Sequence, residues 1–400
     1  MANMIYTAYC RTVQLAIKNY FSLIKWRQPV MVKGEKSLIK VADILKKENI
    51  SSILMMVSGT IYRSGLIDEL IKKITESGVN YVIYDGVSPN PTDIHVEEAY
   101  ELYKQNHCQA ILSIGGGSVI DCAKAVGARV VNPDKTVSKL IGMKVKRNIP
   151  TLIAVPTTSG TGTEATMYAV ITDSKTSHKQ GMGDPHLIPS YAVLDPTLTI
   201  SVPKHITAFT GMDALSHAVE CYLNNTYMTD ALREDARNAV RLIHDNIMDA
   251  YNNGNDMVAR ENMQEGAYLA GRAFNRGMTA YVHSIGHTLG GLYNIPHGKA
   301  MAIILTHVLR KYGAVVYDKL ADFADVCGIE GKDNQEKALG FITWIEETNK
   351  KMGIGNTFPQ IQEKDINQMV TWAYTEGNPL YPAPVIWNKK EFEELIRELM

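Results

Sequence analysis

The sequence predicts an α/β domain with a parallel sheet, followed by a mostly α-helical domain. Four hundred residues exceed what one hydrophobic core usually accommodates, and 45% of them are apolar, so two folded domains are expected. Short apolar runs alternate with helical stretches as far as about Asp195, whereas helical patterns dominate beyond Val202-Pro203. We therefore expect a helical N-terminal extension at residues 1–28, the α/β domain at 29–203 and the all-helical domain at 204–400.

The first 27 residues carry apolar positions at rough helical spacing, with basic residues scattered among them. A secretory signal would place its charges before an unbroken apolar run, and that order is absent. We expect a helix packed on the protein's own surface or on a partner subunit, with a helix lying on a membrane surface as the alternative. No run of about 18 uncharged apolar residues occurs, so no membrane span is expected.

Four short, mostly apolar runs in the first domain are typical of strands buried on both faces of a parallel sheet. These are Ser52–Val57, Tyr81–Tyr84, Ala110–Ile114 and Thr151–Val155. The helices expected between them lie near Gly65–Glu76, Asp93–Gln105 and Ser118–Val131. In the second domain we expect helices near Thr207–Tyr222, Asp230–Tyr251, Ala259–Ala273, Ala280–Leu292, Lys299–Tyr312, Gln335–Lys351 and Lys389–Leu399.

Charge and cysteine content exclude several classes of partner. The 41 basic and 42 acidic residues give a formal net charge of −1, so no nucleic acid or anionic membrane is expected as a partner. Five widely spaced cysteines form no CxxC pair, which fits a reducing cytosol better than a disulfide framework. We expect a cytoplasmic protein.

A glycine-rich turn follows the third expected strand, in the run Ile114-Gly-Gly-Gly-Ser-Val-Ile-Asp121. Glycines let the backbone approach a ligand, and the following helix N-terminus offers unpaired N–H groups, so the turn predicts a pyrophosphate site. Ser118 is expected to cap that helix. The alternative is a tight strand-to-helix turn with no ligand.

A second stretch, Pro156-Thr-Thr-Ser-Gly-Thr-Gly-Thr163, is rich in hydroxyl groups. Its continuation to Ala165 fits GxGxxA, but no strand with an acidic residue follows about twenty residues later, as the dinucleotide fingerprint requires. We interpret the stretch as a hydroxyl-lined wall of the same cofactor site. An ordinary polar loop is the alternative.

Histidines gather between Asp213 and His297. Asp213 and His217 have an i,i+4 spacing, His283 and His287 repeat it, and His297 lies at a turn before another helix. One carboxylate and several imidazoles from separate segments suit a divalent iron or zinc ion with a position left open for substrate. The alternative for each pair is a half-buried hydrogen bond on a helix face.

Together these segments resemble the iron-containing alcohol dehydrogenase family, which has a dehydroquinate synthase-like fold. The resemblance runs in order from about Pro29 to at least Tyr312. It includes Ser88–Thr92, Gly115–Ser118 with Asp121, Pro156–Glu164, Gly211–His217, Val282–Gly291 and Pro296–Gly298. It implies metal and cofactor in the interdomain cleft, hydride transfer between a nicotinamide cofactor and a small primary alcohol or aldehyde, and a homodimer or larger assembly.

The resemblance also implies individual roles. The metal ligands are expected at Asp213, His217, His283 and His297, with Fe²⁺ favoured and Zn²⁺ as the alternative. His287 is expected beside the metal, contacting substrate or relaying protons. The cofactor-binding positions are expected at Ser58, Asn90, Gly116, Gly117, Ser118, Asp121, Thr157, Thr158, Thr161 and Lys179.

One position departs from the pattern of the NAD-preferring members. They carry an aspartate after the first strand, where this chain has Ser58 followed by Gly59. A carboxylate would repel a 2′-phosphate, so its absence favours NADP(H) over NAD(H). The rival functions are glycerol or polyol dehydrogenases of the same fold, a dehydroquinate synthase-like lyase, and a non-catalytic nucleotide-binding protein. Basic residues are sparse near the expected ligands, which disfavours the lyase.

Overall fold

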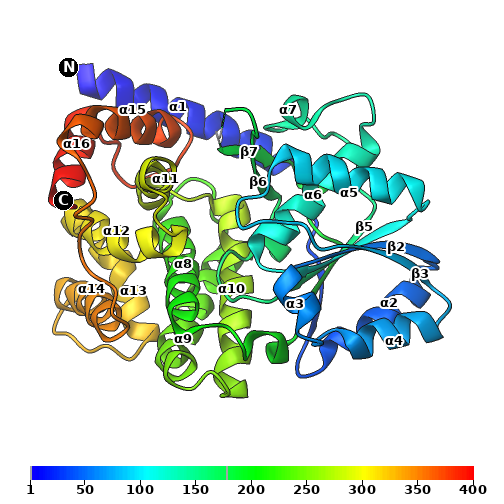
Figure 1. The fold of residues 1–400 in the computed structure, drawn as a ribbon. Helices are drawn as coiled ribbons and strands as arrows, with labels where there is room; N and C mark the ends of the chain where they lie inside the picture. Colours follow the sequence, from blue (N-terminus) through cyan, green and yellow to red (C-terminus); the bar gives the residue numbers. More distant parts are fainter. Residues whose placement is uncertain (1, 177–178) are drawn as a thin grey trace. The chain divides into compact units, whose positions relative to one another are not determined.

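The computed structural model describes residues 2–176 and 179–400, and the chain divides into two compact units (Figure 1). The α/β unit comprises Trp26–Val202 and Asn255–Gln264. The helical unit comprises the described residues before Trp26, Pro203–Gly254 and Glu265–Met400. The described part of the N-terminal extension up to Lys25 therefore belongs to the helical unit, and a short segment after Gly254 belongs to the α/β unit.

The α/β unit is built on a sheet of six parallel strands in the order β1-β8-β5-β4-β2-β3, which confirms the expected parallel sheet. The strands are β1 (Val30–Lys33), β2 (Ser52–Val57), β3 (Asn80–Tyr84), β4 (Ala110–Gly115), β5 (Thr151–Pro156) and β8 (Tyr191–Leu194). The central strands β2, β4 and β5 are almost fully buried, as their continuous apolar sequences require. The sequence analysis did not identify β1 or β8.

Helices cover both faces of this sheet (Figure 1). Leu54 and Met56 of β2 lie in one buried core with residues of α5 and α6, whereas Ile53 and Met55 lie in a second core with residues of α2 and α4. Alternation of side chains along a strand explains this division. The helices of the unit are α2 (Val41–Lys47), α3 (Gly59–Arg63), α4 (Asp68–Glu76), α5 (Asp93–Gln105), α6 (Gly117–Val131) and α7 (Val137–Leu140).

An antiparallel hairpin, β6 (Tyr168–Thr172) and β7 (Lys179–Gly183), follows the hydroxyl-rich stretch. The hairpin is hydrogen-bonded to the loop before α5, since Thr172 N–H donates to Pro91 O at 2.8 Å. The sequence analysis found no strands in this part of the chain.

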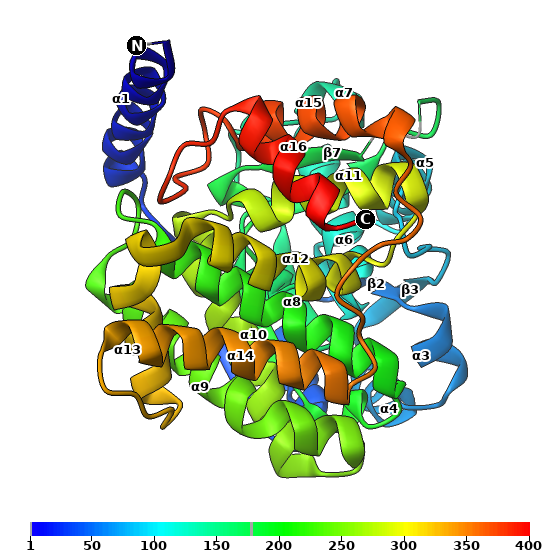
Figure 2. The same ribbon diagram turned by 90° about the vertical axis from the view of Figure 1, so that its left-hand side faces the viewer.

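The helical unit confirms the expected mostly α-helical second half (Figure 2). Its helices are α1 (Ala2–Leu23), α8 (Lys204–Leu223), α9 (Asp230–Asn252), α11 (Tyr281–Tyr293), α12 (His297–Tyr312), α13 (Tyr317–Val326), α14 (Asn334–Lys351), α15 (Ile366–Gly377) and α16 (Lys389–Glu398). Helix α10 (Met257–Gly277) begins within the α/β unit, which extends to Gln264. Across the described residues, no helix has both the length and the apolar character that a membrane crossing needs.

Candidate metal centre and nucleotide site

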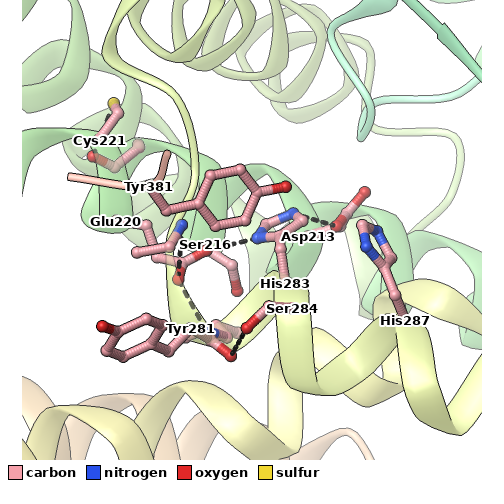
Figure 3. Close-up of polar contacts among 12 residues, drawn as sticks. Asp213, Ser216, Glu220, Cys221, Tyr281, His283, Ser284, His287 and Tyr381 are labelled. Atoms are coloured by element: carbon pink, nitrogen blue, oxygen red, sulfur yellow. Dashed lines mark hydrogen bonds and ion pairs between the residues drawn. The ribbon is translucent and has the colours of Figure 1, made fainter. Parts of the chain in front are cut away.

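Three helices of the helical unit bring one carboxylate and two imidazoles together. The ligand atoms of Asp213 (α8), His283 (α11) and His297 (α12) all lie within 4.8 Å of one another. Asp213 Oδ1 is 3.4 Å from His297 Nε2 and 3.9 Å from His283 Nε2 (Figure 3 shows Asp213 and His283). Three of the four residues expected as metal ligands therefore form one compact set.

A glycine lets α12 approach α8 closely enough to complete this set. A Cβ atom on Gly298 would lie 2.2 Å from the backbone oxygen of Phe209, so no other residue fits without moving the backbone. Phe209 lies one turn before Asp213 on α8, and His297 directly precedes Gly298. The close approach thus places the first residue of α12 beside the carboxylate.

The buried polar atoms of the site test whether a cation fits there. Among the described residues, Asp213 Oδ1, His217 Nδ1 and His283 Nε2 are buried atoms that find no hydrogen-bond partner. Buried polar atoms are almost always paired, because an unpaired one costs the full desolvation penalty. A divalent ion between Asp213 and His283 would satisfy two of these atoms, and imidazole nitrogen with carboxylate oxygen is a set of ligand atoms that iron and zinc accept.

His217 lies against this set without belonging to its tightest cluster. Its ring stacks on Phe274 at a centroid distance of 4.2 Å and on His283 at 4.6 Å. The helical spacing puts it on the same face of α8 as Asp213. The unpaired Nδ1 makes His217 the candidate for a fourth ligand.

Glu220 orients His283 and was missed by the sequence analysis. Its Oε2 contacts His283 Nδ1, and its Oε1 accepts hydrogen bonds from the N–H groups of Ala280 at 3.1 Å and Val282 at 2.8 Å (Figure 3). A metal-binding histidine commonly pairs its other nitrogen with a carboxylate in this way. The available signal was helical spacing, because Glu220 follows His217 by three residues on α8.

Burial sets the protonation states of these residues. It lowers the pKa of His217 to about 3 and that of His283 well below its ordinary value, so both imidazoles keep a lone pair at neutral pH. Burial alone would raise the pKa of Asp213, but the neighbouring imidazoles, His217 first, hold it below its usual range. Burial raises the pKa of Glu220 to about 8.

His287 lies one helical turn beyond His283, beside the ligand set and outside it. Its ring stacks on that of His297 at 5.3 Å, and its Nδ1 is 2.7 Å from Glu376 Oε1. The side chain is 42% exposed, so solvent reaches the ring. Burial alone would raise the pKa of Glu376, but the contact with His287 keeps it below its ordinary value. Nothing in the local sequence signals Glu376, which is 89 residues away on α15.

In the α/β unit, the glycine turn has the geometry expected of a phosphate site. β4 ends at Gly115, Gly116 is the N-cap residue of α6, and the helix begins at Gly117. A Cβ on Gly117 would lie 2.8 Å from Thr161 Cγ2, whereas one on Gly116 would make an ordinary contact with Thr158 at 3.6 Å. The turn is therefore packed against the hydroxyl-rich stretch, most tightly at Gly117 and more loosely at Gly116.

The expected capping role of Ser118 is wrong. Gly116 occupies the N-cap position, so Ser118 lies inside the first turn of α6. Its hydroxyl donates to Pro89 O at 2.5 Å instead. Ser118 thus ties α6 to the loop that carries Asn90, whose side chain is exposed.

The two stretches singled out for nucleotide binding lie against each other. Thr157 N–H donates to Gly115 O at 3.0 Å, and Thr158 and Thr161 face Gly116 and Gly117. Asp121 has both carboxylate oxygens engaged by the protein, because Oδ1 accepts from Thr163 Oγ1 at 2.6 Å and Oδ2 from Val170 N–H at 2.9 Å. Its contacts hold the hydroxyl-rich stretch and the hairpin to α6.

A buried lysine, which the sequence analysis missed, strengthens the same junction. Lys124 Nζ donates to Thr163 Oγ1 at 2.8 Å, Thr166 O at 2.8 Å and Tyr168 O at 2.7 Å. Burial lowers the pKa of this lysine to about 8. The remaining expected residue of this region, Lys179, begins β7 with an exposed side chain, opposite Thr172 in the hairpin.

Ser58 lies at the carboxyl end of β2, next to the glycine turn. Its N–H donates to Ile114 O at 3.0 Å, and its Oγ accepts from Ile61 N–H at 3.4 Å, which caps α3. A Cβ on Gly59 would lie 2.9 Å from Arg63 Nη1, so the Arg63 guanidinium lies over this glycine. The Arg63 guanidinium therefore lies beside the residue that follows Ser58, the position at which NAD-preferring relatives are expected to carry a carboxylate.

Comparison with known proteins covers nearly the whole chain. Residues 29–196 match the model of the family described as "Iron-containing alcohol dehydrogenase", and residues 207–400 match "Fe-containing alcohol dehydrogenase family, C-terminal". The 1,3-propanediol dehydrogenase of Citrobacter freundii is 36% identical over 343 residues, which cover 84% of this chain and 87% of that protein.

Two further matches agree. The NAD-dependent methanol dehydrogenase of Bacillus methanolicus is 34% identical, with 88% of this chain and 94% of that protein covered. A crystal structure of 1,3-propanediol oxidoreductase superposes with a TM-score of 0.90 at 31% identity, over 94% of this chain and 100% of that one. These matches show that the chain belongs to the iron-containing alcohol dehydrogenase family of NAD(P)-dependent oxidoreductases.

Proposed function

We propose that this protein is a metal-dependent alcohol dehydrogenase that interconverts a small primary alcohol and its aldehyde, with NADP(H) preferred over NAD(H). The observation that carries the proposal is a set of three buried atoms that have no hydrogen-bond partner. They are Asp213 Oδ1, His217 Nδ1 and His283 Nε2. Asp213 and His283 belong to one compact cluster with His297, and the ring of His217 stacks on that of His283, so these unpaired atoms lie in one place. A divalent ion at this place gives them a function.

Asp213, His283 and His297 would hold the ion, with His217 as the fourth ligand. Fe²⁺ is favoured by the family and Zn²⁺ is the alternative. When bound, the ion supplies Lewis acidity, which polarises an alcohol or carbonyl oxygen. Glu220 fixes the orientation of the His283 ring, so that Nε2 faces the carboxylate.

His287 is the proton-handling residue of the proposed site. It lies beside His297 and contacts Glu376 through Nδ1, and its side chain is 42% exposed, so solvent reaches the ring. His287 can therefore release to solvent the proton that an alcohol loses on oxidation.

The cofactor's pyrophosphate is proposed to lie on Gly116, at the N-terminus of α6. The hydroxyls of Thr157, Thr158 and Thr161, with Asn90 and Lys179, are proposed to contact the ribose and nicotinamide. Ser58 and Gly59 leave room for a 2′-phosphate, and the Arg63 guanidinium offers it a charge-assisted hydrogen bond. This arrangement favours NADP(H), although one similar relative is named for NAD.

The proposed substrate class follows the relatives, which act on methanol and 1,3-propanediol by name. We further propose a cytoplasmic homodimer or larger homo-oligomer. The test is a panel of methanol, ethanol, butanol, 1,3-propanediol and glycerol, assayed with NADP⁺ and NAD⁺ after loading with Fe²⁺ or Zn²⁺. Metal-dependent reduction of the cofactor by a primary alcohol is expected. If no alcohol on the panel reduces either cofactor with either metal, the proposal is wrong.

A further inference from the structure

The N-terminal helix α1 lies before the residues that match the family, yet it makes specific contacts with a segment near the metal centre. Gln14 is fully buried, and its amide group donates from Nε2 to Pro379 O at 3.1 Å and to Tyr381 O at 2.8 Å. Arg11 donates to Gln14 Oε1 at 2.8 Å and to Pro384 O at 2.9 Å. A buried amide with both donors and its acceptor engaged is a strongly directional contact.

The segment that Gln14 holds reaches the site through a side chain. Tyr381 carries both the backbone oxygen bound by Gln14 and a hydroxyl that donates to Glu376 Oε1 at 3.0 Å. The same carboxylate oxygen is 2.7 Å from His287 Nδ1. A continuous series of contacts therefore runs from Gln14 through Tyr381 and Glu376 to His287.

Other contacts fix the same segment from the opposite side and from the end of α1. Tyr281, two residues before His283, donates through its hydroxyl to Asn378 Oδ1 at 2.9 Å. Tyr227 donates to Leu380 O at 3.2 Å and packs edge-on against Phe21 of α1 at 5.4 Å. The backbone around Tyr381 is therefore held between α1 and the helix that carries the histidines.

From these contacts we infer that α1 is a positioning element of the active site: Gln14 places Tyr381 so that its hydroxyl holds Glu376 against His287. The inference rests on the proposed function, which gives His287 its role in proton transfer. Gln14 touches neither substrate nor cofactor, so it is a positioning residue. Its effect on catalysis passes through the Tyr381 hydroxyl.

The test compares Gln14→Leu and Tyr381→Phe, alone and combined, in the metal-loaded full-length protein. Each single variant is expected to lower kcat at least fivefold with the cofactor KM unchanged. The combined variant should be no slower than Tyr381→Phe, because both changes break one series of contacts. Thr12→Ala is the matched control, since Thr12 is exposed on the same helix and its hydroxyl donates to Ala8 O.

Amide hydrogen exchange of residues 378–384 gives a readout that needs no activity. Exchange in this segment should rise in Gln14→Leu and stay at the wild-type rate in Thr12→Ala. An unchanged kcat in Tyr381→Phe overturns the inference even if Gln14→Leu fails to fold. The inference is also overturned if the loss of kcat in the combined variant equals the product of the two single losses. If the wild type oxidises no alcohol, the proposed function fails; unchanged exchange in Gln14→Leu refutes the contact of α1 separately.

Discussion

The glycine turn after β4 and the candidate metal centre on α8, α11 and α12 differ in which part of the chain would supply the binding atoms. At the turn these would be backbone N–H groups at the start of α6, where two glycines carry no side chains. At the metal centre they are side-chain atoms of Asp213, His283 and His297, contributed by three separate helices.

This difference determines how each site affects the stability of the protein when its ligand is absent. The turn is satisfied without a ligand, because open backbone at a helix N-terminus can be solvated. The metal centre buries donor atoms that find no partner among the described residues, so the metal-free protein bears an unfavourable free energy there. Substitutions should therefore separate the two sites by their effects on stability as well as on activity.

The largest effect is expected from Asp213→Asn, which keeps the shape of the side chain and removes its charge. The value of kcat/KM should fall about a thousandfold, because loss of the ion forfeits several kcal/mol of charge stabilisation. The metal-free variant should melt at the same temperature as the metal-free wild type or higher, because a buried charge has been removed. Calorimetry of both metal-free proteins checks this, and a clearly lower melting temperature would show that Asp213 stabilises the fold.

His287→Ala tests the boundary of the metal centre. The variant should keep its metal and lose about 100-fold in kcat, the lower end of the usual contribution of a general acid or base. Metal analysis and steady-state kinetics on one preparation separate the two properties. His307→Ala is the control, because His307 belongs to the same unit and its Nε2 lies near Asn356 O, 2.9 Å away. Metal loss in His287→Ala would make His287 a ligand.

Gly116→Ala tests the turn. The backbone of Gly116 is in an extended conformation and a Cβ there would meet Thr158 at an ordinary 3.6 Å, so the fold should be unaffected. The methyl group would nevertheless occupy the place proposed for pyrophosphate, and the cofactor KM should rise about thirtyfold, or ~2 kcal/mol. Gly355→Ala is the control, since a Cβ there has no described atom within 4 Å. An unchanged KM would mean that the turn binds no phosphate.

The smallest effect concerns cofactor choice. Ser58→Asp preserves the cap of α3, because aspartate is also a good N-cap residue, but it places a carboxylate where a 2′-phosphate would lie. The ratio of kcat/KM with NADPH to that with NADH should fall at least tenfold, on the order of 1.4 kcal/mol. Arg63→Ala should lower the same ratio, whereas Lys72→Ala, a change at an exposed lysine of α4, should not. A ratio that stays constant in both site variants would show that this end of β2 does not select the cofactor.

The sequence predicted those parts of the fold that are local patterns. β2, β4 and β5 are continuous apolar runs, and most of the helices were found to within a few residues. β1 was not found because its apolar run, at residues 30–32, is only three residues long. β8 has four buried residues, too few to distinguish a strand from other apolar segments.

In the candidate site, too, only the features that are local in the sequence could be predicted. Three of the proposed ligands stood out through i,i+4 spacings and His297 through its place at a turn before a helix, and the glycine turn is contiguous. Glu376 and Tyr381 acquire their roles through packing of α11 on a segment about 90 residues later, and no local pattern signals such a contact. The polar groups that orient the site were therefore largely beyond prediction from the sequence.

The proposed function requires that Asp213, His217, His283 and His297 share a divalent ion. Elemental analysis after loading with Fe²⁺ or Zn²⁺ and gel filtration tests it most directly, with wild type, His283→Ala and the control His244→Ala of α9 measured together. We expect one metal ion per chain in the wild type and in His244→Ala, and loss of most of it in His283→Ala. Wild-type metal content in His283→Ala would contradict the assignment.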